Sequence, residues 1–175
     1  MVGFPANPFD AHAPEMGLVT VKNQVIDKSI QCAYIEAIRR AKNFIYIENQ
    51  YFFGSCASWD RDQDCECLHL IPIEIALKVV SKIRAREQFA VYVVTPMWPK
   101  GISDGDTVQT ILHWFRNTAC MMYKMIGEAL MEEGLDQKFH PTDYLNFFCV
   151  GNMEVKLPGG QARMAFKIII ERQTH

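Results

Sequence analysis

The sequence has no long hydrophobic run, and its charges nearly balance. The longest unbroken apolar stretch, Phe89–Val94, has the length of a β-strand and falls far short of the roughly 18 residues that span a bilayer. The first residues contain neither a basic region nor an apolar segment, and residue 2 is Val, so we expect neither a secretory signal nor N-myristoylation. The formal net charge of −2 argues against a protein that binds nucleic acid by neutralising many phosphates.

The cysteines lack the spacing of a disulfide framework or of a zinc site. There are six in a chain of 175 residues with no expected secretory signal, so reduced thiols are the simpler interpretation. Cys56, Cys65 and Cys67 are close in sequence, yet structural zinc usually takes four ligands in two spaced pairs, and no second pair follows. We therefore predict free thiols and no metal at these residues.

Helical and strand-like patterns alternate along a chain long enough for one domain with a substantial core. Such alternation implies right-handed crossovers and a mostly parallel sheet with flanking helices, so the predicted fold class is α/β. No glycine-rich phosphate loop follows any strand, which argues against a free-standing nucleotide-binding domain. The predicted elements are a helix over 27–42, a strand over Phe44–Gln50, a helix from about Pro72, a strand over Phe89–Thr95, a helix over Thr107–Glu132, a strand over Tyr144–Val150 and a further candidate strand over Ala165–Glu171.

Polar side chains gather at the end of the first predicted strand. Glu48, Asn49 and Gln50 follow an apolar run and precede Tyr51. In open α/β sheets ligands bind at the carboxyl ends of the strands, and strand alternation puts Glu48 and Gln50 on one face and Asn49 on the other. Such groups orient a catalytic imidazole or bind a substrate head group; alternatively, they only satisfy nearby backbone groups.

The segment Phe44–Phe52, followed by Gly54 and Ser55, resembles the hallmark segment of eukaryotic phospholipases D. The resemblance covers about residues 3–157 in order and is closest to the plant type, which carries a C2 domain; Cys56–Cys67 and Ile73–Leu77 look most like the delta form. Further similar segments are 27–42, Leu70–Pro72, Val79–Ile83, Val91–Pro99, Met121–Lys124, Tyr144–Cys149 and Gly151–Asn152.

The resemblance implies an αβα sandwich that hydrolyses phosphatidylcholine-type lipids to phosphatidic acid and an alcohol such as choline. The family's chemistry uses two His-x-Lys-x-x-x-x-Asp motifs, whose histidines act as nucleophile and as general acid and base. None of the five histidines here begins such a motif, since Pro14, Ile71, Phe115 and Thr142 stand where lysine is required and His175 is the last residue. The chain is therefore interpreted as an internal segment between the two motifs, with no catalytic residue of its own.

This interpretation divides the chain into an irregular lead-in over 1–24, part of the catalytic domain over 25–152 and a diverged or variable tail over 153–175. Glu48, Asn49, Gln50 and Tyr51 become candidate residues of the substrate rim or its supporting groups. The implied partners are a phospholipid surface and the remainder of the catalytic domain, and the implied location is cytoplasmic and peripheral to membranes. The alternative is a non-catalytic module that binds a lipid or a protein.

Two loops invite more specific hypotheses. The family is generally calcium-dependent, and Asp60–Glu66 is acidic, but an EF-hand counted from Asp60 would need glycine and an acidic residue where Cys65 and Ile71 stand. A solvated surface loop is therefore favoured over a Ca²⁺ site. Met97 and Trp98 follow the second strand, where they either dip into a lipid interface or pack as a cap on the sheet.

Overall fold

A three-stranded parallel sheet forms the centre of the fold. The computed structural model describes residues 28–102, 105–151, 153–156 and 162–165. Strands β1 (Phe44–Glu48), β2 (Ala90–Pro96) and β3 (Leu145–Val150) lie in the order β1-β2-β3, with Tyr46 opposite Tyr92 and Val93 opposite Phe147. Each strand is a short run of β-branched and aromatic residues, which suit a pleated sheet. The predicted α/β class with a parallel sheet is confirmed.

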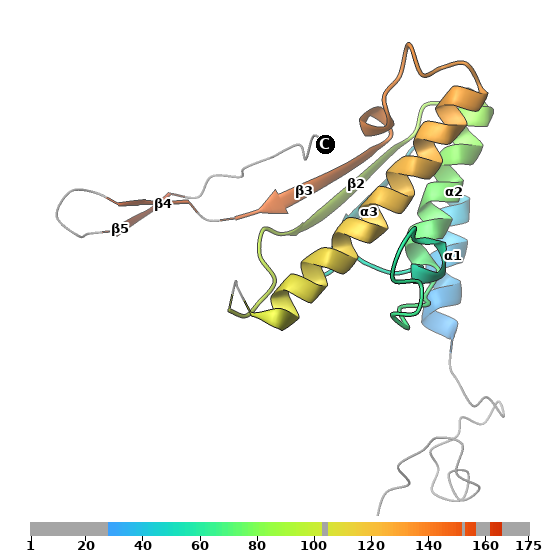
Figure 1. Ribbon diagram of the computed structural model, residues 1–175. Coiled ribbons are helices and arrows are strands. Elements are labelled where there is room, and N and C mark those ends of the chain that lie inside the picture. The colour runs from blue at the N-terminus through green and yellow to red at the C-terminus, as the bar shows by residue number, and fades with distance from the viewer. Residues whose placement is uncertain (1–27, 103–104, 152, 157–161, 166–175) are drawn as a thin grey trace, which may run out of the picture.

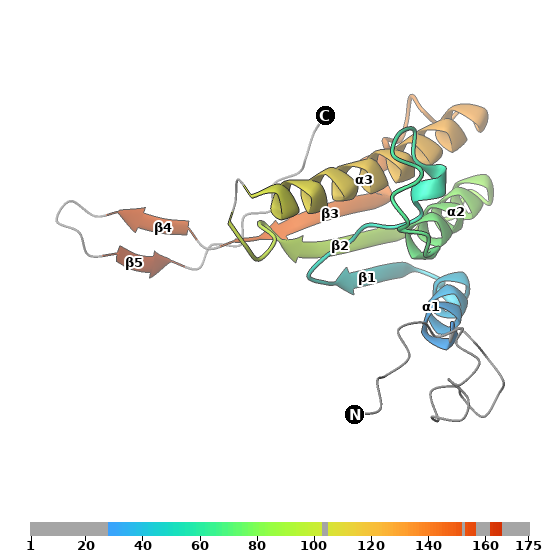
Figure 2. The ribbon, with the colours of Figure 1, turned by 60° about the horizontal axis from the view of Figure 1, so that its bottom comes forward.

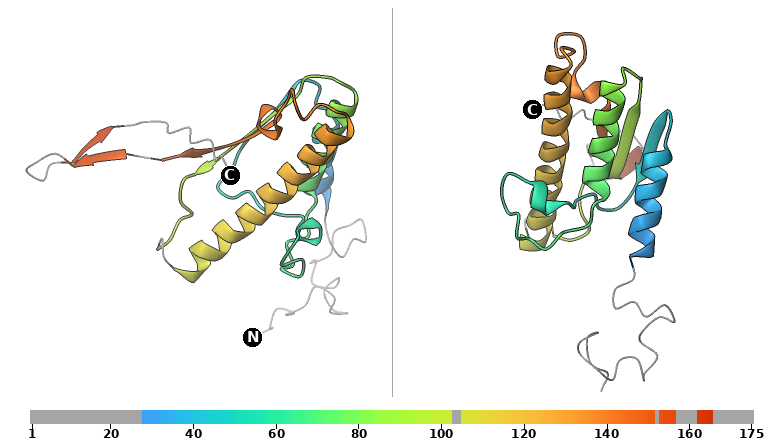
Figure 3. Two further views of the ribbon diagram at one scale, coloured as in Figure 1. Left: turned by 45° about the horizontal axis from the view of Figure 1, so that its top comes forward. Right: turned by 90° about the vertical axis from the view of Figure 1, so that its right-hand side faces the viewer.

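The helices form a single layer on one face of this sheet. Helix α2 (Ile71–Arg84) connects β1 to β2, and α3 (Asp106–Glu132) connects β2 to β3. Both crossovers step to the next strand in the same direction, so right-handed connections put both helices on the same face. Helix α1 (Ser29–Arg40) packs beside α2 and extends the layer, as Figures 1 and 3 show.

Apolar side chains between the sheet and the helices make up the core. Alternate residues of β2 and β3, such as Val91, Val93 and Leu145, point into it and are fully buried. They meet Ile75, Val79 and Ile83 of α2 and a stripe of α3 that includes Met122, Ile126 and Leu130, all of them buried. Burying such side chains stabilises the fold by about 1.5–3 kcal/mol each.

The opposite face of the sheet, here called the outer face, carries no helix among the described residues. Phe44, Tyr46, Tyr92 and Phe148 all belong to it, and Tyr92 stacks on Phe148 with ring centroids 6.2 Å apart. Phe44 and Tyr46 are 61% and 57% exposed. Figure 2 shows α2 and α3 on one side of the three strands only. The described residues therefore supply one of the two helical layers of the expected sandwich.

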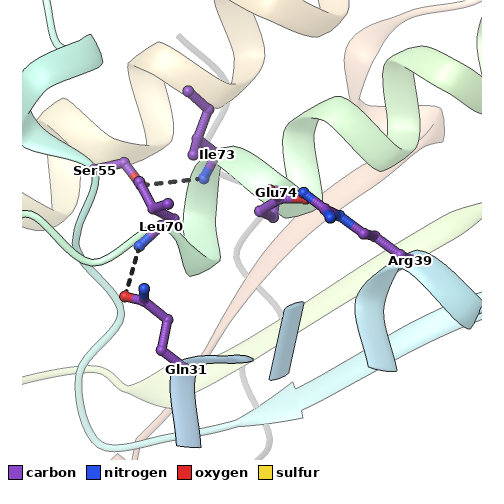
Figure 4. A network of polar contacts seen from close by, with 6 residues as sticks. All are labelled: Gln31, Arg39, Ser55, Leu70, Ile73 and Glu74. Atoms are coloured by element: carbon purple, nitrogen blue, oxygen red, sulfur yellow. Dashed lines mark hydrogen bonds and ion pairs between the residues drawn. The ribbon is translucent and has the colours of Figure 1, made fainter. Parts of the chain in front are cut away.

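The loop 53–70 ties the end of β1 to the start of α2. It contains the short 3-10 helix η1 (Cys56–Ser58) and closes on itself where Ser55 N donates to His69 O at 2.9 Å. Ser55 Oγ then accepts from Ile73 N at 3.2 Å, and Gln31 of α1 accepts from Leu70 N at 3.3 Å (Figure 4). These side chains satisfy backbone donors that the first turn of a helix leaves without partners.

Most predicted elements agree with the structure to within a few residues. The hairpin of β4 (Met153–Lys156) and β5 (Ala162–Ala165) was not predicted, nor was the 3-10 helix η2 (Pro141–Asp143) before β3. The candidate strand over Ala165–Glu171 and the proposed lead-in over 1–24 lie wholly or almost wholly outside the described residues. No described helix is both long and apolar enough to cross a bilayer.

Candidate functional site

The carboxyl edge of the sheet brings together most of the predicted site residues. Strand pairing ends at Glu48 opposite Val94, and Asn49 N still donates to Val94 O at 3.0 Å before the chain turns away. The loop after β2, with Met97, joins the same edge because Met97 N donates to Val150 O at 2.9 Å. Segments from all three strands thus meet where ligands bind in open α/β sheets.

Glu48 lies on the outer face of the sheet. Its Oε2 accepts a hydrogen bond of 3.1 Å from Tyr46 Oη, two residues earlier on the same face. This hydrogen bond, made to a negatively charged acceptor, is the main cause that raises the pKa of Tyr46. Glu48 is exposed, so its carboxylate is available to a group that covers this face.

Gln50 and Tyr51 lie on the other side, towards the beginning of α3. They line a hollow of about 60 Å³ together with Thr95, Phe115 and Cys149. The prediction that Glu48 and Gln50 share a face is wrong, because β1 ends at Glu48 and strand alternation does not continue beyond it. The four predicted residues therefore flank the edge of the sheet on both sides.

Asn49 and Gln50 use their amide groups locally. Asn49 Nδ2 donates to Tyr51 O at 2.9 Å, and Gln50 Nε2 donates to Tyr51 Oη at 3.2 Å. For Asn49 the simpler alternative holds, because its side chain satisfies the backbone of the turn. The amide oxygens of Asn49 and Gln50 and the carboxylate of Glu48 can accept hydrogen bonds from a ligand or a neighbouring imidazole.

No described histidine reaches this edge. His69 Nε2 lies 2.7 Å from Phe53 O, His113 Nε2 lies 2.7 Å from Asp62 Oδ2, and His140 caps η2 by accepting from Thr142 N. Covalent catalysis needs a nucleophile and a base within hydrogen-bond reach of each other. Within the part of the chain that the structure describes, the edge can bind and orient, and it holds no histidine that could act as nucleophile or base.

Gly54 and Ser55, here called the hub, connect the loop after β1 to α2 and α3. Sequence reasoning did not assign this role to them. A Cβ atom on Gly54 would lie 2.3 Å from His69 Cε1, so only glycine fits beneath this ring as it stands. Gly54 N donates to the buried Thr118 Oγ1 of α3 at 3.2 Å, and Gly54 O accepts from Trp59 Nε1 at 3.0 Å. The Gly-Ser pair after the hallmark strand was the available signal, because glycine marks close approach of backbone to side chain.

Met97 and Trp98 behave differently from each other. Met97 rests on Gly151, where a Cβ atom would lie 3.1 Å from Met97 Cε. Trp98 is 55% exposed, and Ile102 on the same loop is 77% exposed. The two alternatives for Trp98, a lipid contact and a packed cap over the sheet, both stay predictions.

The acidic loop is engaged with α3. Asp60 Oδ1 accepts from Lys124 Nζ at 2.7 Å, and Asp62 Oδ2 lies 2.7 Å from His113 Nε2 and 3.2 Å from Asn117 Nδ2. The hydrogen bond from His113 is the main cause that lowers the pKa of Asp62. Among the described residues, no group of three His, Cys, Asp or Glu side chains is arranged to hold a metal ion.

The cysteines of the same loop are free thiols. Burial is the main cause that raises the pKa of Cys67 to about 11, and burial also raises the pKa of Cys65. A thiol with a raised pKa stays protonated near neutral pH and is a weak nucleophile. Their packing against the core is the role that the structure shows for Cys65 and Cys67.

Comparisons with known proteins point in one direction. Residues 6–173 match the family described as Phospholipase D. The chain is 57% identical over 161 residues to phospholipase D alpha 1 of Oryza sativa subsp. japonica, and 56% identical over 161 residues to phospholipase D alpha 1 of Vigna unguiculata. It is also 56% identical over 161 residues to phospholipase D alpha 2 of Arabidopsis thaliana. These are alpha forms, so a delta-like subtype stays a prediction.

The similarity covers nearly all of this chain but little of each relative. For the Oryza sativa protein, the matched region is 90% of this chain and 19% of the relative. For the Arabidopsis thaliana protein, the matched region is 90% of this chain and 20% of the relative. The chain thus spans about a fifth of the length of the curated relatives that it matches.

Proposed function

The chain belongs to the phospholipase D family, and from that membership we propose that it forms part of the catalytic region of an enzyme that cleaves phosphatidylcholine-type lipids to phosphatidic acid and an alcohol such as choline. The observation that carries the proposal is the position of the hallmark segment. Its polar residues Glu48 and Gln50 flank the carboxyl edge of a parallel sheet, where a catalytic group from elsewhere in the protein can meet them.

In this proposal the chain supplies framework and rim, and other parts of the protein supply the nucleophile. Glu48 and Gln50 offer hydrogen-bond acceptors to a histidine or to a lipid head group, and Tyr51 borders the same hollow. The sequence contains no His-x-Lys-x-x-x-x-Asp motif. We propose that calcium required by the assembled enzyme is bound outside the acidic loop, because Asp60 and Asp62 are engaged by Lys124 and His113.

The outer face supports the remainder of the catalytic domain as a partner. Its exposed aromatic side chains, Phe44, Tyr46 and Tyr92, form a contiguous apolar surface of the kind that packs against another layer. Both crossovers place their helices on the opposite face, so a second layer has to come from residues outside β1–β3. The same surface also favours the second candidate function, a non-catalytic module that binds another protein.

The isolated chain is expected to release no choline from phosphatidylcholine vesicles. The sequence contains no His-x-Lys-x-x-x-x-Asp motif, so the two histidines that the family uses as nucleophile and as general acid and base are missing from this chain. Choline release is measured against a no-protein control, with the Oryza sativa enzyme as the positive control. Release that exceeds the control, and that co-purifies with the chain through two unrelated chromatographic steps, would refute this part of the proposal.

We further propose that the loop with Trp98 and Ile102 contacts the phospholipid surface, which would make the enzyme peripheral to membranes and cytoplasmic. An exposed indole on a loop beside the site can enter the head-group region of a bilayer. The test uses the Oryza sativa enzyme in which the matching residues are replaced by those of this chain, here called the segment-replaced enzyme.

In the segment-replaced enzyme, Trp98→Ala is expected to weaken vesicle binding about tenfold, which corresponds to about 1.4 kcal/mol of lost apolar burial. The melting temperature should hardly change, because substitutions at exposed positions usually alter stability by less than about 0.5 kcal/mol. Vesicle sedimentation and calorimetry measure the two quantities. Leu77→Ala, at an exposed position on α2, is the matched control. Parallel losses in binding and stability would contradict the lipid contact.

A further inference from the structure

We propose that a hollow between the acidic loop and the middle of α3 binds a phosphate monoester. The hollow measures about 330 Å³, and its lining includes Arg61, His113, Arg116 and Asn117. It lies on the surface of α3 that faces the loop, and none of its lining residues lines the hollow at the carboxyl edge of the sheet. The inference does not depend on the proposed function, because it concerns only side chains of this chain.

Two tethers hold the loop on α3 and frame the hollow. Lys124 Nζ contacts Asp60 Oδ1 at 2.7 Å at one end, and His113 with Asn117 holds Asp62 at the other. The α3 residues that face the hollow, from His113 to Lys124, recur at helical spacing and so form one continuous stripe. The loop is thus fixed against the helix at two points.

The carboxylates at the hollow already have partners, whereas the guanidinium groups do not. Asp60 is paired with Lys124, and Asp62 is bonded to both His113 and Asn117. Arg61 acts on Asp62 only at longer range, where it contributes to the lowered pKa of that carboxyl. Among the described residues, neither Arg61 nor Arg116 forms an ion pair or a side-chain hydrogen bond within contact distance.

Charge favours an anion at this position. Among the residues that line the hollow, Arg61 and Arg116 carry two positive charges against the single carboxylate of Asp60, which is itself paired with Lys124. The chain as a whole is formally −2, so this excess is local and not a general property of the surface. An unpaired guanidinium offers a rigid fork of donors that matches phosphate oxygens in a bidentate manner.

A dianionic phosphate monoester suits the site better than a singly charged anion. It can accept from both forks at once, and hydrogen bonds between ionised groups are stronger than those between neutral groups. The volume is large enough for the phosphate and the first atoms attached to it. Both a lipid head group, such as that of phosphatidic acid, and a small soluble ligand can carry such a phosphate. The test therefore has a soluble arm and a lipid arm.

In the soluble arm, inorganic phosphate is titrated into the full chain at constant ionic strength, and the Nε–H signals of the arginines are followed by NMR. The signals of Arg61 and Arg116 are expected to shift together and to saturate. Arg61→Gln/Arg116→Gln should weaken binding at least about tenfold, since two charge-assisted contacts are lost. Arg61→Lys/Arg116→Lys, which keeps the charge but not the fork, should bind with intermediate affinity.

The matched control is Arg40→Gln/Arg84→Gln, which removes the same charge from arginines paired with Glu36 and Glu132 on exposed helix surfaces. It should leave phosphate binding unchanged. In the lipid arm, sedimentation with phosphatidylcholine vesicles is compared with and without phosphatidic acid. Loss of lipid binding in the Arg61/Arg116 variant identifies a head group, whereas loss confined to the soluble arm identifies a soluble ligand.

Two results would refute the proposed phosphate site. One is a parent chain that binds neither inorganic phosphate nor phosphatidic acid vesicles at these arginines. The other is an equal loss of binding in the control pair and in the Arg61/Arg116 pair, which would show a diffuse effect of net charge. Because the arginine signals are read in the unsubstituted chain, misfolding of a variant cannot leave the question open.

Discussion

The double substitution Tyr46→Lys/Tyr92→Lys is expected to lower choline release by the segment-replaced enzyme at least about a hundredfold. The two tyrosines are direct partners across β1 and β2 at the centre of the outer face. If a second layer covers this face, two ammonium groups would be buried and the carboxylate of Glu48 could neutralise only one of them, and an uncompensated buried charge costs about 3–5 kcal/mol. The second layer should therefore fail to pack against the sheet, and the catalytic region should not assemble.

The same substitution is expected to have the opposite effect on the isolated chain. With no second layer, Tyr46 is 57% and Tyr92 36% exposed, so the lysines would be solvated and would oppose aggregation. Light scattering of the chain at fixed concentration should fall. The control is Leu77→Lys/Met131→Lys, which places lysines at exposed apolar positions of the helical layer. If the segment-replaced enzyme with Tyr46→Lys/Tyr92→Lys stays fully active, no second layer covers the outer face and this prediction is wrong.

Trp59→Ala is expected to destabilise the fold by about 3–5 kcal/mol, the usual cost of removing a large buried aromatic side chain. Trp59 is 1% exposed, and its Nε1 donates to Gly54 O at 3.0 Å. The ring thus connects the acidic loop to the hub that follows the hallmark strand. Urea unfolding of the chain in the Tyr46→Lys/Tyr92→Lys background measures the change, because that background limits aggregation.

One further variant at Trp59 separates packing from hydrogen bonding, and a second variant, at Trp98, is the control for the loss of an indole. Trp59→Phe keeps most of the apolar contact but leaves Gly54 O without its donor, so a loss of about 1–3 kcal/mol is expected. Trp98→Ala removes the same side chain type from an exposed position and should change stability by less than about 0.5 kcal/mol. Equal losses for Trp59→Ala and Trp98→Ala would show that the loop is not part of the core.

The regular elements could be predicted from sequence because each carries its own periodic signal. The strand at Phe44 and the helix at Thr107 show runs or repeats that one element alone explains. The hub could not be predicted, because the contacts of Gly54 with His69 and Thr118 join residues far apart in sequence. Periodicity says nothing about such long-range contacts.

The candidate site was predicted in its location but not in its geometry. The carboxyl end of β1 follows from the position of Glu48 after an apolar run. The candidate site residues lie on two sides of the sheet because β1 stops pairing with β2 at Val94. The position of that last pair depends on the neighbouring strand and not on β1 alone. Likewise, the predicted solvated surface loop is exposed in the structure, but the contacts of Asp60 and Asp62 with Lys124 and His113, on a helix more than forty residues later, could not be predicted.

The central claim is that this chain supplies framework and rim to a phospholipase D while the nucleophile lies elsewhere. Choline release by the segment-replaced enzyme tests it most directly, with the unaltered Oryza sativa enzyme measured in parallel. We expect kcat/KM to remain within about tenfold of the unaltered enzyme, equivalent to about 1.4 kcal/mol of transition-state stabilisation. A segment-replaced enzyme that folds and binds vesicles normally but releases no choline would contradict the claim.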